Sequence, residues 1–452
     1  MSAEYPQSRF ETNELVHAAS LRSMISRSRR NRNIAAAIIG NTLEWYDILA
    51  YAYFVKAIAA NFFPAANGAT SLLLAYGTFG LSFVARPLGA LVIGRIADRR
   101  GRRTALVYAS VLMFIGTLAI AVLPTHDTIG IAAPILLLAA RLVQGFSVGG
   151  EFGSAAAYLA EQSINRRAFY SSLQFASQGM GMITAALVGL ALAAVLSGDE
   201  LTAWGWRIPF LIGAALGPVA YLIRRNADET EEFLAVDAHG VDSAPAEAGA
   251  DVRSSRARFV AICALGAGVV LACNVTLYFL VYIPTFAQTA LGADPAIAYT
   301  SAILSGSTLL FGAPVAGLLA DRFGAQRHGI VAALLIIVTT YPLFVAMIAG
   351  ANVGAILIGQ FGLAIVASLY VGALPAILAE MFETRNRSLG VSISYNLAVM
   401  TGGGFAQMIF VALISATGNN ASPTYYVIAS GAISLGSLLL CRRFARVDRT
   451  RY

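Results

Sequence analysis

Two charged residues, Arg141 and Glu151, lie within a long apolar stretch that runs from Thr128 to Glu161. The stretch predicts a single helix that can cross about 30 Å of hydrocarbon at about 1.5 Å per residue. A charge at the centre of a bilayer costs roughly 2.5 to 3.5 kcal/mol on insertion scales, so a helix that keeps two of them is expected to face a protein interior or an aqueous path. The combination indicates a transport helix, although an ion pair that only holds helices together remains the alternative.

A second set of polar residues could exchange protons. Glu44, Asp47 and Tyr51 are spaced i, i+3, i+7 and share one face of an earlier apolar stretch. Burial favours the neutral form of a carboxylate and a nearby arginine favours its charged form, so a carboxylate beside Arg141 could switch between the two. Protonation would then free the arginine to bind an anion. Asp47, Glu44 and Glu151 are all candidates for this proton-coupling role.

Arginine side chains in the same region favour a carboxylate as the substrate. The guanidinium group is permanently charged and matches a carboxylate with two parallel hydrogen bonds, and Arg86 and Arg141 supply two such groups. For the tyrosines on neighbouring helices, a substrate contact and ordinary helix packing are equally good interpretations. The further candidate substrate contacts are Tyr46, Tyr51, Gln144, Gln174, Gln178, Asn274, Tyr278, Tyr282, Tyr370, Tyr395 and Asn396.

The composition predicts an all-α integral membrane protein. The chain of 452 residues is 58% hydrophobic and 12% charged, with a mean hydropathy of +0.69, which is far too apolar for a soluble domain. Twelve apolar segments, long enough to span a bilayer, fall into two groups of six. They lie near residues 34–60, 71–97, 104–123, 129–160, 169–196, 206–223, 259–289, 297–320, 329–349, 352–380, 388–416 and 423–441.

The polar stretches divide the chain into five parts. We expect a cytoplasmic tail (1–33), a six-helix bundle (34–223), a cytoplasmic connector (224–258), a second six-helix bundle (259–441) and a second cytoplasmic tail (442–452). All basic residues except Lys56, Arg86, Arg141 and Arg207 fall in tails or loops on one side, which orients both termini toward the cytoplasm. The arginine-rich tails then read as topology signals and lipid contacts, and not as a nucleic-acid surface. We expect a monomer in a bacterial inner membrane.

The two groups of helices share a repeated loop motif. Gly94-x-x-x-Asp98-Arg99 returns as Gly317-x-x-x-Asp321-Arg322, and Glu161 is echoed by Glu380 at a similar offset. Such echoes predict a duplicated six-helix unit whose halves rock around a central site. Carboxylates in these loops could bind helix N-termini and arginines of the other half and so hold one side shut. The candidate gating residues are Gly94, Asp98, Arg99, Arg102, Glu161, Arg167, Asp321, Arg322, Glu380 and Arg385.

Several other functions are excluded by the residues present. The single lysine, Lys56, does not follow a glycine-rich run, so no Walker A loop for ATP exists. The three cysteines lack C-x-x-C spacing and the four histidines are scattered, so we expect no metal, no disulfide and no cofactor. A G-x-S-x-G match around Ser147 falls in the middle of a predicted helix, and no apolar span contains a histidine. We therefore expect a protein that is not an enzyme and draws on a proton gradient.

Four motifs resemble those of the metabolite:proton symporter family of the major facilitator superfamily. They are GNTLEWYD (40–47), RPLG (86–89), GRIADRRGRR (94–103) and RLVQGFSVGGE (141–151), and the resemblance extends from about 33 to 441. It implies a proton-coupled carrier that works by alternating access, with carriers of citrate, α-ketoglutarate, shikimate and proline or betaine as relatives. By similarity to proton-linked sugar carriers of the superfamily, it favours Asp47 pairing with Arg141. The stretch before Arg141 is most similar to citrate carriers.

Two positions depart from the family pattern and leave the substrate open. The first-helix motif of the family has an aromatic residue where Ile48 stands and a glycine where Ala52 stands. A di- or tricarboxylate such as citrate or α-ketoglutarate is the favoured substrate. The alternatives are a zwitterion such as proline or betaine held by an aromatic cage including Trp45, an aromatic acid, an exporter or antiporter of the same fold, and a membrane sensor.

Overall fold

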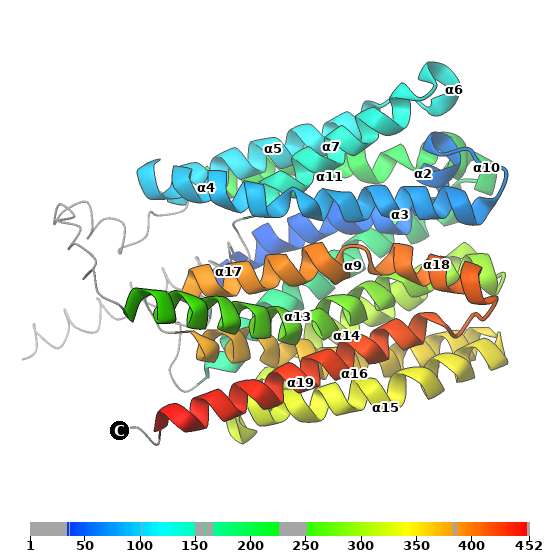
Figure 1. Ribbon diagram of the computed structural model, residues 1–452. Coiled ribbons are helices and arrows are strands. Elements are labelled where there is room, and N and C mark those ends of the chain that lie inside the picture. Colours follow the sequence, from blue (N-terminus) through cyan, green and yellow to red (C-terminus); the bar gives the residue numbers. More distant parts are fainter. Residues whose placement is uncertain are drawn as a thin grey trace, which may run out of the picture.

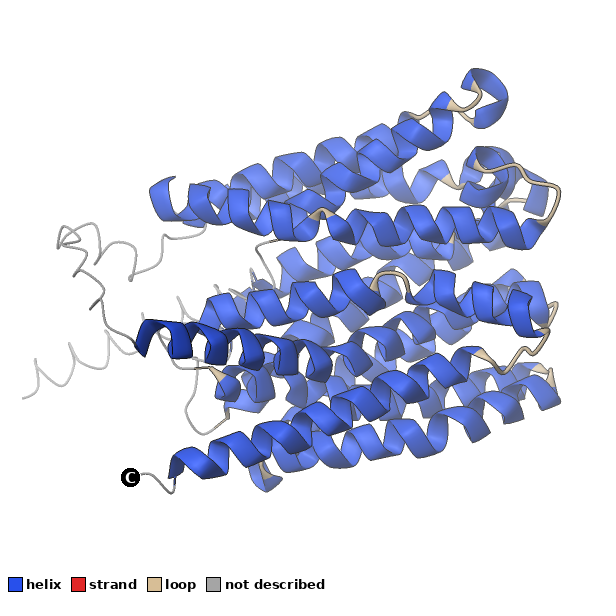
Figure 2. Ribbon diagram, in the orientation of Figure 1, coloured by secondary structure: helices blue, strands red, loops and turns tan. Residues whose placement is uncertain are grey.

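The computed structural model describes residues 34–35, 37–100, 102–149, 159, 166–225, 251–382 and 387–449. These residues form long helices that run side by side, and no strand occurs among them (Figure 1, Figure 2). The all-α membrane fold predicted from the composition is therefore confirmed.

The first half of the chain starts with helical residues 37–53, which continue after a turn at Phe54 into α2 (Val55–Phe62). The remaining elements of this half, in chain order, are α3 (Gly68–Val84), α4 (Arg86–Arg100), α5 (Arg102–Val122), α6 (His126–Ile129), α7 (Ala132–Val148), α9 (Arg167–Val195), α10 (Gly198–Glu200), η1 (Leu201–Gly205) and α11 (Arg207–Arg225).

The second half has the same helical character. Its elements are α13 (Asp251–Ala290), α14 (Pro295–Phe323), α15 (Ala325–Gly350), α16 (Val353–Met381), α17 (Arg387–Ala398), η3 (Val399–Gly403), α18 (Ala406–Thr417) and α19 (Pro423–Arg449). The helix α13 begins before residue 259, the predicted start of the seventh span, and α19 continues through most of the predicted tail 442–452. The boundaries between the two bundles and the connector stay a prediction.

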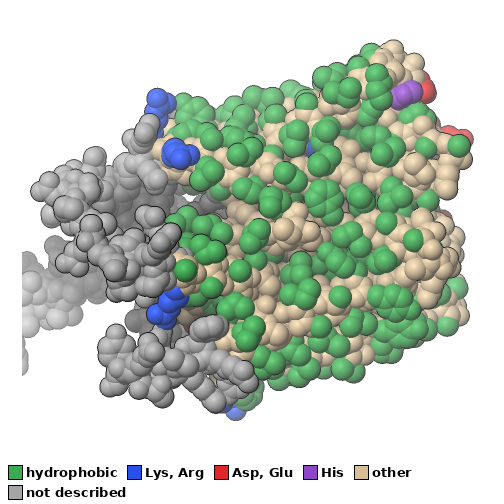
Figure 3. Space-filling view, viewed as in Figure 1, with side chains coloured by type: hydrophobic (Ala, Val, Ile, Leu, Met, Phe, Trp, Pro, Cys, Tyr) green, Lys and Arg blue, Asp and Glu red, His purple; other side chains and the backbone are tan. Residues whose placement is uncertain are grey.

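Nine helices in the described part of the chain are long and apolar enough to cross a membrane. Ala132–Val148 and Arg207–Val219 are apolar but shorter, and the first helical segment is interrupted at Phe54. The number of twelve spans therefore stays a prediction. Apolar side chains cover the outer face (Figure 3), and Phe311 and Ile358 are 70% and 71% exposed, as lipid-facing residues would be.

The helix that carries Arg141 begins later than predicted. Gly130 has a φ of 59°, a left-handed conformation that ends α6, and α7 starts at Ala132. Pro134 then lies in the first turn of α7, where its missing N–H removes no helical hydrogen bond. The prediction of one continuous helix from Thr128 to Glu161 is wrong at its start, and its end lies outside the described residues.

A proline also separates α3 from α4 and positions Arg86. Pro87 has no N–H for the carbonyl of Phe83 four residues earlier, and its ring crowds that carbonyl. The helix α3 accordingly ends at Val84 and α4 starts at Arg86. Both Phe83 and Arg86 are buried at this break and lie beside the site described below.

The two halves of the chain meet along α9 and α14. A Cβ on Gly179 would lie 2.6 Å from the carbonyl oxygen of Gly306, and a Cβ on Gly306 would lie 2.7 Å from that of Gly179. Farther along the same pair, a Cβ on Gly317 would lie 2.8 Å from the carbonyl oxygen of Ala168. These glycines let the two backbones approach closely, as small residues do between membrane helices.

The two ends of the bundle differ in charge. Lys and Arg side chains gather at the end where α19 finishes, whereas Asp, Glu and His side chains lie at the opposite end (Figure 3). At the acidic end the N–H and the hydroxyl of Ser197 donate to Glu200 at 2.9 and 2.8 Å, and these hydrogen bonds lower the pKa of the exposed carboxyl.

Candidate functional site

Arg141 lies in the interior of the first half and is only 2% exposed. Its Nη1 donates to Oε1 of Gln144 at 2.8 Å, and its Nη2 donates to Oγ of Ser82 at 3.4 Å. The guanidinium carbon stands 4.4 Å from the ring centroid of Tyr51 and 4.9 Å from that of Phe79. Aromatic faces attract a cation, so these rings compensate part of the cost of burying the charge.

Arg86 also packs its guanidinium group against an aromatic ring, and this ring shares a neighbour with Phe79. It is 5% exposed, and its guanidinium carbon lies 4.4 Å from the ring centroid of Phe83. Phe79 and Phe83 each pack edge-on against Tyr278 of α13, with centroids 5.8 and 5.7 Å apart. Two permanent positive charges therefore lie on one aromatic cluster, which we define as Tyr51, Phe79, Phe83 and Tyr278.

Asp47 is a buried carboxylate, 7% exposed, on the first helix. Its Oδ1 has no hydrogen-bond partner among the described residues, and the side chain of Thr117 on α5 lies beside the carboxylate and interacts with it. Gly213 of α11 leaves the space for this group, because a Cβ there would collide with Oδ1 of Asp47. A carboxylate with an unused oxygen in the interior is a candidate proton acceptor.

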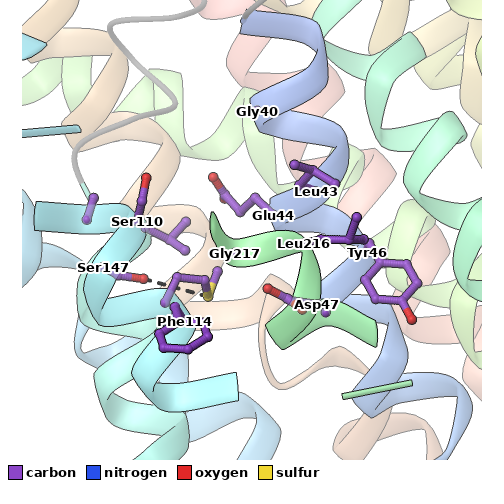
Figure 4. A pocket seen from close by; sticks show the side chains of 14 residues that line it. Gly40, Leu43, Glu44, Tyr46, Asp47, Ser110, Phe114, Ser147, Leu216 and Gly217 are labelled. Carbon is purple, nitrogen blue, oxygen red and sulfur yellow. Dashed lines mark hydrogen bonds between the residues drawn. The ribbon is translucent and has the colours of Figure 1, made fainter. Parts of the chain in front are cut away.

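Two adjacent cavities meet at Asp47. The smaller one, with about 250 Å³ of empty space that includes space open to the outside, is lined by Asp47, Arg86 and Arg141 together with Ser82 and Gln144. The larger one, with about 510 Å³ including space open to the outside, is lined by Asp47 and by Gly40, Glu44, Tyr46, Ser110, Phe114, Ser147, Leu216 and Gly217 (Figure 4). Asp47 therefore borders the arginines on one side and the Glu44 cavity on the other.

The predicted pair of Asp47 and Arg141 is brought together without a direct hydrogen bond. Both side chains line the smaller cavity and interact electrostatically. The recorded hydrogen bonds of Arg141, however, go to Gln144 and Ser82. A direct pair in another conformation of the carrier stays a prediction.

Other predicted substrate contacts line neither cavity but are buried with unused polar atoms. Neither the amide nitrogen nor the amide oxygen of Gln178 has a hydrogen-bond partner among the described residues. The side-chain oxygens of Gln174 and Asn274 also lack one there. Tyr395 lies near Tyr278 and interacts electrostatically with Arg86. These residues remain candidates for contact with a polar substrate, because a buried polar atom without a partner is costly.

Several predicted contacts are used in helix packing instead. The hydroxyls of Tyr46, Tyr51 and Tyr370 donate to the carbonyls of Pro209, Ala75 and Val269. Asn396 donates to the carbonyl of Gly149 at 3.1 Å, and Tyr282 packs against Tyr76, Phe286 and Phe410. For Tyr370, whose ring contributes nothing to the aromatic cluster, helix packing is the better interpretation.

The gating candidates are only partly described. Asp321 accepts hydrogen bonds from the N–H groups of Ala168 and Phe169 at 2.8 and 3.0 Å, so it caps the start of α9 in the other half. Glu380 interacts electrostatically with Arg167 and Asp321. The guanidinium of Arg322 lies 5.4 Å from the ring centroid of Phe323. Glu151, Glu161 and Arg385 lie outside the described residues, as do the side chains of Asp98, Arg99 and Arg102; no atom would crowd a Cβ on Gly94 within 4 Å.

Residues that could support other chemistry are not assembled. Among the described residues no group of three or more His, Cys, Asp or Glu side chains could hold a metal, and Cys263, Cys273 and Cys441 are buried free thiols. Ser147 lies inside α7, where its hydroxyl donates to the carbonyl of Gln144 at 2.6 Å. The serine motif therefore sits in a helix and not at the strand-to-helix turn that hydrolases need.

Several residues of the site were not found from the sequence, and Ser82, which binds Arg141, is one of them. Thr117, Phe79, Phe83 and Gly213 carry no charge and lie in apolar runs, where their residue types are ordinary. The spacing of Phe79, Phe83 and Arg86 at i, i+4 and i+7 was the one available signal, since it places an arginine over rings on one helical face.

Known proteins resemble this chain over most of its length. A family model for the Major Facilitator Superfamily matches residues 48–339. The citrate-proton symporter of Klebsiella pneumoniae is 35% identical over 415 residues, 90% of each chain. The α-ketoglutarate permease of Escherichia coli K12 is 34% identical over 92% of this chain and 94% of its own, and the proline/betaine transporter of the same strain is 32% identical over 91% and 83%.

Solved structures show the same fold. The proton:xylose symporter XylE bound to 6-bromo-6-deoxy-D-glucose superimposes with a TM-score of 0.71 at 18% identity, covering 92% of this chain and 96% of its own. The partially occluded inward-open conformation of XylE from E. coli gives 0.70 over 92% and 98%. The relatives are those expected of the metabolite:proton symporter family, which confirms the resemblance of the motifs. The chain belongs to the Major Facilitator Superfamily.

Proposed function

We propose that this protein is a secondary active transporter that carries a small organic acid together with protons by alternating access. The observation that carries the proposal is a buried carboxylate, Asp47, that borders the same cavity as two buried arginines. The arginines offer a site for a carboxylate, and Asp47 offers a site for the proton. Relatives named as a citrate-proton symporter and an α-ketoglutarate permease support the same function.

A di- or tricarboxylate is favoured over a zwitterion by the use of the aromatic rings. A quaternary ammonium group needs free aromatic faces. Here Tyr51 and Phe79 already face Arg141, and Phe83 faces Arg86. The site thus offers positive charge where a betaine would need ring faces. The relatives named as proline/betaine transporters keep the zwitterion as the second candidate.

The membrane setting follows from the same reasoning. We place the protein in a bacterial cytoplasmic membrane with its basic end and both termini toward the cytoplasm, because Lys and Arg are retained on that side. It functions as a monomer of two six-helix bundles, needs no cofactor other than the proton gradient, and binds no nucleic acid. Asp321, Glu380 and Arg167 act as part of a cytoplasmic gate between the halves.

Asp47→Asn separates proton coupling from substrate exchange. In proteoliposomes loaded and assayed with radiolabelled citrate and α-ketoglutarate, the wild type is expected to accumulate substrate when the outside is acidified. Asn cannot release a proton, so the variant should lose accumulation while it retains counterflow exchange. Loss of both activities would mean that Asp47 serves binding or folding, and accumulation driven by an acidic interior would identify an antiporter.

The substrate class can be measured without transport. Ligands that bind only the folded protein raise its thermal stability. We expect citrate or α-ketoglutarate to raise the melting temperature of the purified protein, more at acidic than at neutral pH, and proline and glycine betaine to have no effect. Stabilisation by betaine or proline alone would contradict the organic-acid proposal.

A further inference from the structure

We propose that Thr117 and Gln144 form a hydrogen-bond relay through which the protonation of Asp47 controls the position of Arg141. This inference rests on the proposed proton-coupled function and assigns a role to Thr117, a residue outside every motif in the sequence. In this relay Thr117 and Gln144 are positioning residues, since they act on the arginine and not on the substrate itself.

The relay is a continuous chain of polar groups. Arg141 donates from Nη1 to Oε1 of Gln144 at 2.8 Å, and Gln144 donates from Nε2 to Oγ1 of Thr117 at 2.9 Å. The side chain of Thr117 lies beside the carboxylate of Asp47, and we assign the Thr117 hydroxyl as the donor to that carboxylate. A Cβ on Gly213 would meet both Oδ1 of Asp47 and the methyl group of Thr117, the latter at 3.2 Å, so these two side chains lie side by side.

In the proposed relay every hydrogen points from the cation toward the anion. The guanidinium of Arg141 supplies the first donor, and the ionised carboxylate of Asp47 is the last acceptor. Hydrogen bonds aligned in this way polarise and strengthen one another. All four residues are at most 7% exposed, and Thr117 is fully buried.

The hydrogen bonding of Thr117 differs from that of two other buried helical threonines, Thr78 and Thr340. The hydroxyls of Thr78 and Thr340 donate to the carbonyls of Leu74 and Ile336, four residues earlier in their own helices. The hydroxyl of Thr117 instead accepts from Gln144 on α7. It therefore connects α5 with α7, whereas the hydroxyls of Thr78 and Thr340 bond within one helix.

Protonation of Asp47 should loosen the far end of the relay. A neutral carboxyl group is a weaker acceptor than a carboxylate, so the Thr117 hydroxyl loses its strongest partner. Gln144 then holds Arg141 less firmly in its present direction, and the guanidinium can turn toward an incoming carboxylate. The proton and the anion are thus coupled over four side chains without a direct ion pair between Asp47 and Arg141.

Other charged and titratable groups surround Asp47 and must be separated from the relay. Glu44 and Tyr46 come from its own helix and line the larger cavity with it. Arg86 of α4 and Arg141 of α7 line the smaller cavity. The residues of α5 and α11 that line the two cavities carry no charge. A mutation of Thr117 on α5 therefore removes a hydroxyl without changing the charge around Asp47.

The test replaces the hydroxyl while keeping the shape of the side chain. Thr117→Val removes the donor to Asp47, and Thr117→Ser restores it. Thr340→Val is the matched control, because it removes an equally buried threonine hydroxyl that bonds only within its own helix. Infrared spectra of the purified proteins, titrated with pH, follow the carboxyl C=O band, and Asp47→Asn identifies the band that belongs to Asp47.

Removing a donor to a carboxylate favours its neutral form. We expect the midpoint of the Asp47 band to move by about one unit to higher pH in Thr117→Val, to return toward the wild-type value in Thr117→Ser, and to stay unchanged in Thr340→Val. The affinity for citrate is also measured as a function of pH, with Thr340→Val as the reference so that the ionisation of citrate cancels. The change in affinity with pH should be at least threefold smaller in Thr117→Val.

The outcomes separate this proposal from the function on which it rests. An unchanged band midpoint together with an unchanged pH dependence of binding in Thr117→Val overturns the relay, even if the wild type couples transport to protons. A shift that Thr117→Ser does not reverse also overturns it, since the effect would then come from packing. If the wild type itself shows no proton-driven uptake of citrate or α-ketoglutarate, the proposed function fails and the relay fails with it.

Discussion

At the scale of single residues, the site is built around two buried arginines that form no direct bond to a carboxylate within the described part of the chain. Burying an unpaired charge costs several kcal/mol unless other groups compensate it. For Arg141 this compensation comes from two aromatic faces and two polar side chains, and for Arg86 from the ring of Phe83. Such an arrangement keeps positive charge available for an anion.

Replacing this arginine by lysine should weaken substrate binding while keeping the charge. In Arg141→Lys the ammonium group cannot offer two parallel hydrogen bonds to a carboxylate. We expect the half-saturating concentration of citrate in proteoliposome uptake to rise at least tenfold, which corresponds to about 1.4 kcal/mol.

The control for that change is Arg207→Lys. Arg207 also lies over an aromatic ring, with its guanidinium carbon 4.4 Å from the centroid of Trp206, but it lies away from both cavities. Its replacement should leave the half-saturating concentration within twofold of the wild type. Equal kinetics in Arg141→Lys and Arg207→Lys would remove Arg141 from the substrate site.

At the scale of helices, α9 and α14 form the most extensive contact between the halves in the described part of the chain. Their glycines allow backbone atoms of one helix to lie against those of the other. Alternating access requires the two halves to move against each other, and a smooth surface of small residues permits such movement without interlocked side chains.

Adding a methyl group to this contact should separate the two helices. In Gly179→Ala the new Cβ would lie 2.6 Å from the carbonyl oxygen of Gly306 and 2.7 Å from the N of Leu310. Overpacking of this kind costs about 1–3 kcal/mol, so we expect the melting temperature to fall by several degrees and the transport rate to drop. Gly436→Ala, which meets no atom within 4 Å, should melt like the wild type; equal melting of both variants would contradict a tight contact.

At the scale of the whole molecule, contacts at different depths join the two halves. Toward the basic end, Asp321 of α14 accepts two hydrogen bonds from the start of α9. Farther along the bundle, aromatic pairs cross between the halves, with ring centroids 6.3 Å apart for Trp45 and Tyr278 and 6.0 Å for Phe54 and Tyr299. The polar contact is the one that a single substitution can weaken without leaving a cavity.

Removing this cap should shift the conformational equilibrium of the carrier. A carboxylate at a helix N-terminus contributes roughly 0.3 to 2 kcal/mol. We expect Asp321→Ala to increase the population that is open at the basic end by at least twofold, measured from distances between spin labels placed on the two halves at that end.

Asp294→Ala provides a control within the same helix. Asp294 caps the N-terminal end of α14, whereas Asp321 lies near the C-terminal end of that helix. Asp294 accepts from the N–H of Ala296 at 2.7 Å, so its hydrogen bond stays within one half. This variant should lower stability without changing the distance distribution. The same shift in both variants would show that loss of a helix cap, and not loss of the contact between halves, moves the equilibrium.

Much of this architecture could be predicted because it depends on local properties of the chain. Apolar length determines which segments span a membrane, and charged residues inside such segments are costly enough to mark the interior. Arg86, Arg141 and Asp47 were found in this way. The start of α7 was missed, because a glycine in an apolar run gives no sign of whether it will adopt a positive φ.

The sequence by itself determined the fold class, the family and the charged residues of the site. Only the tertiary structure decided how these residues are connected, since Thr117, Phe79 and Gly213 contact site residues on other helices. A hydroxyl, a ring or a missing Cβ has the same sequence signature in a packing position as in a functional one. What distinguishes them is the partner that folding brings within hydrogen-bonding or van der Waals distance, and for Thr117 that partner is Gln144 on one side and Asp47 on the other.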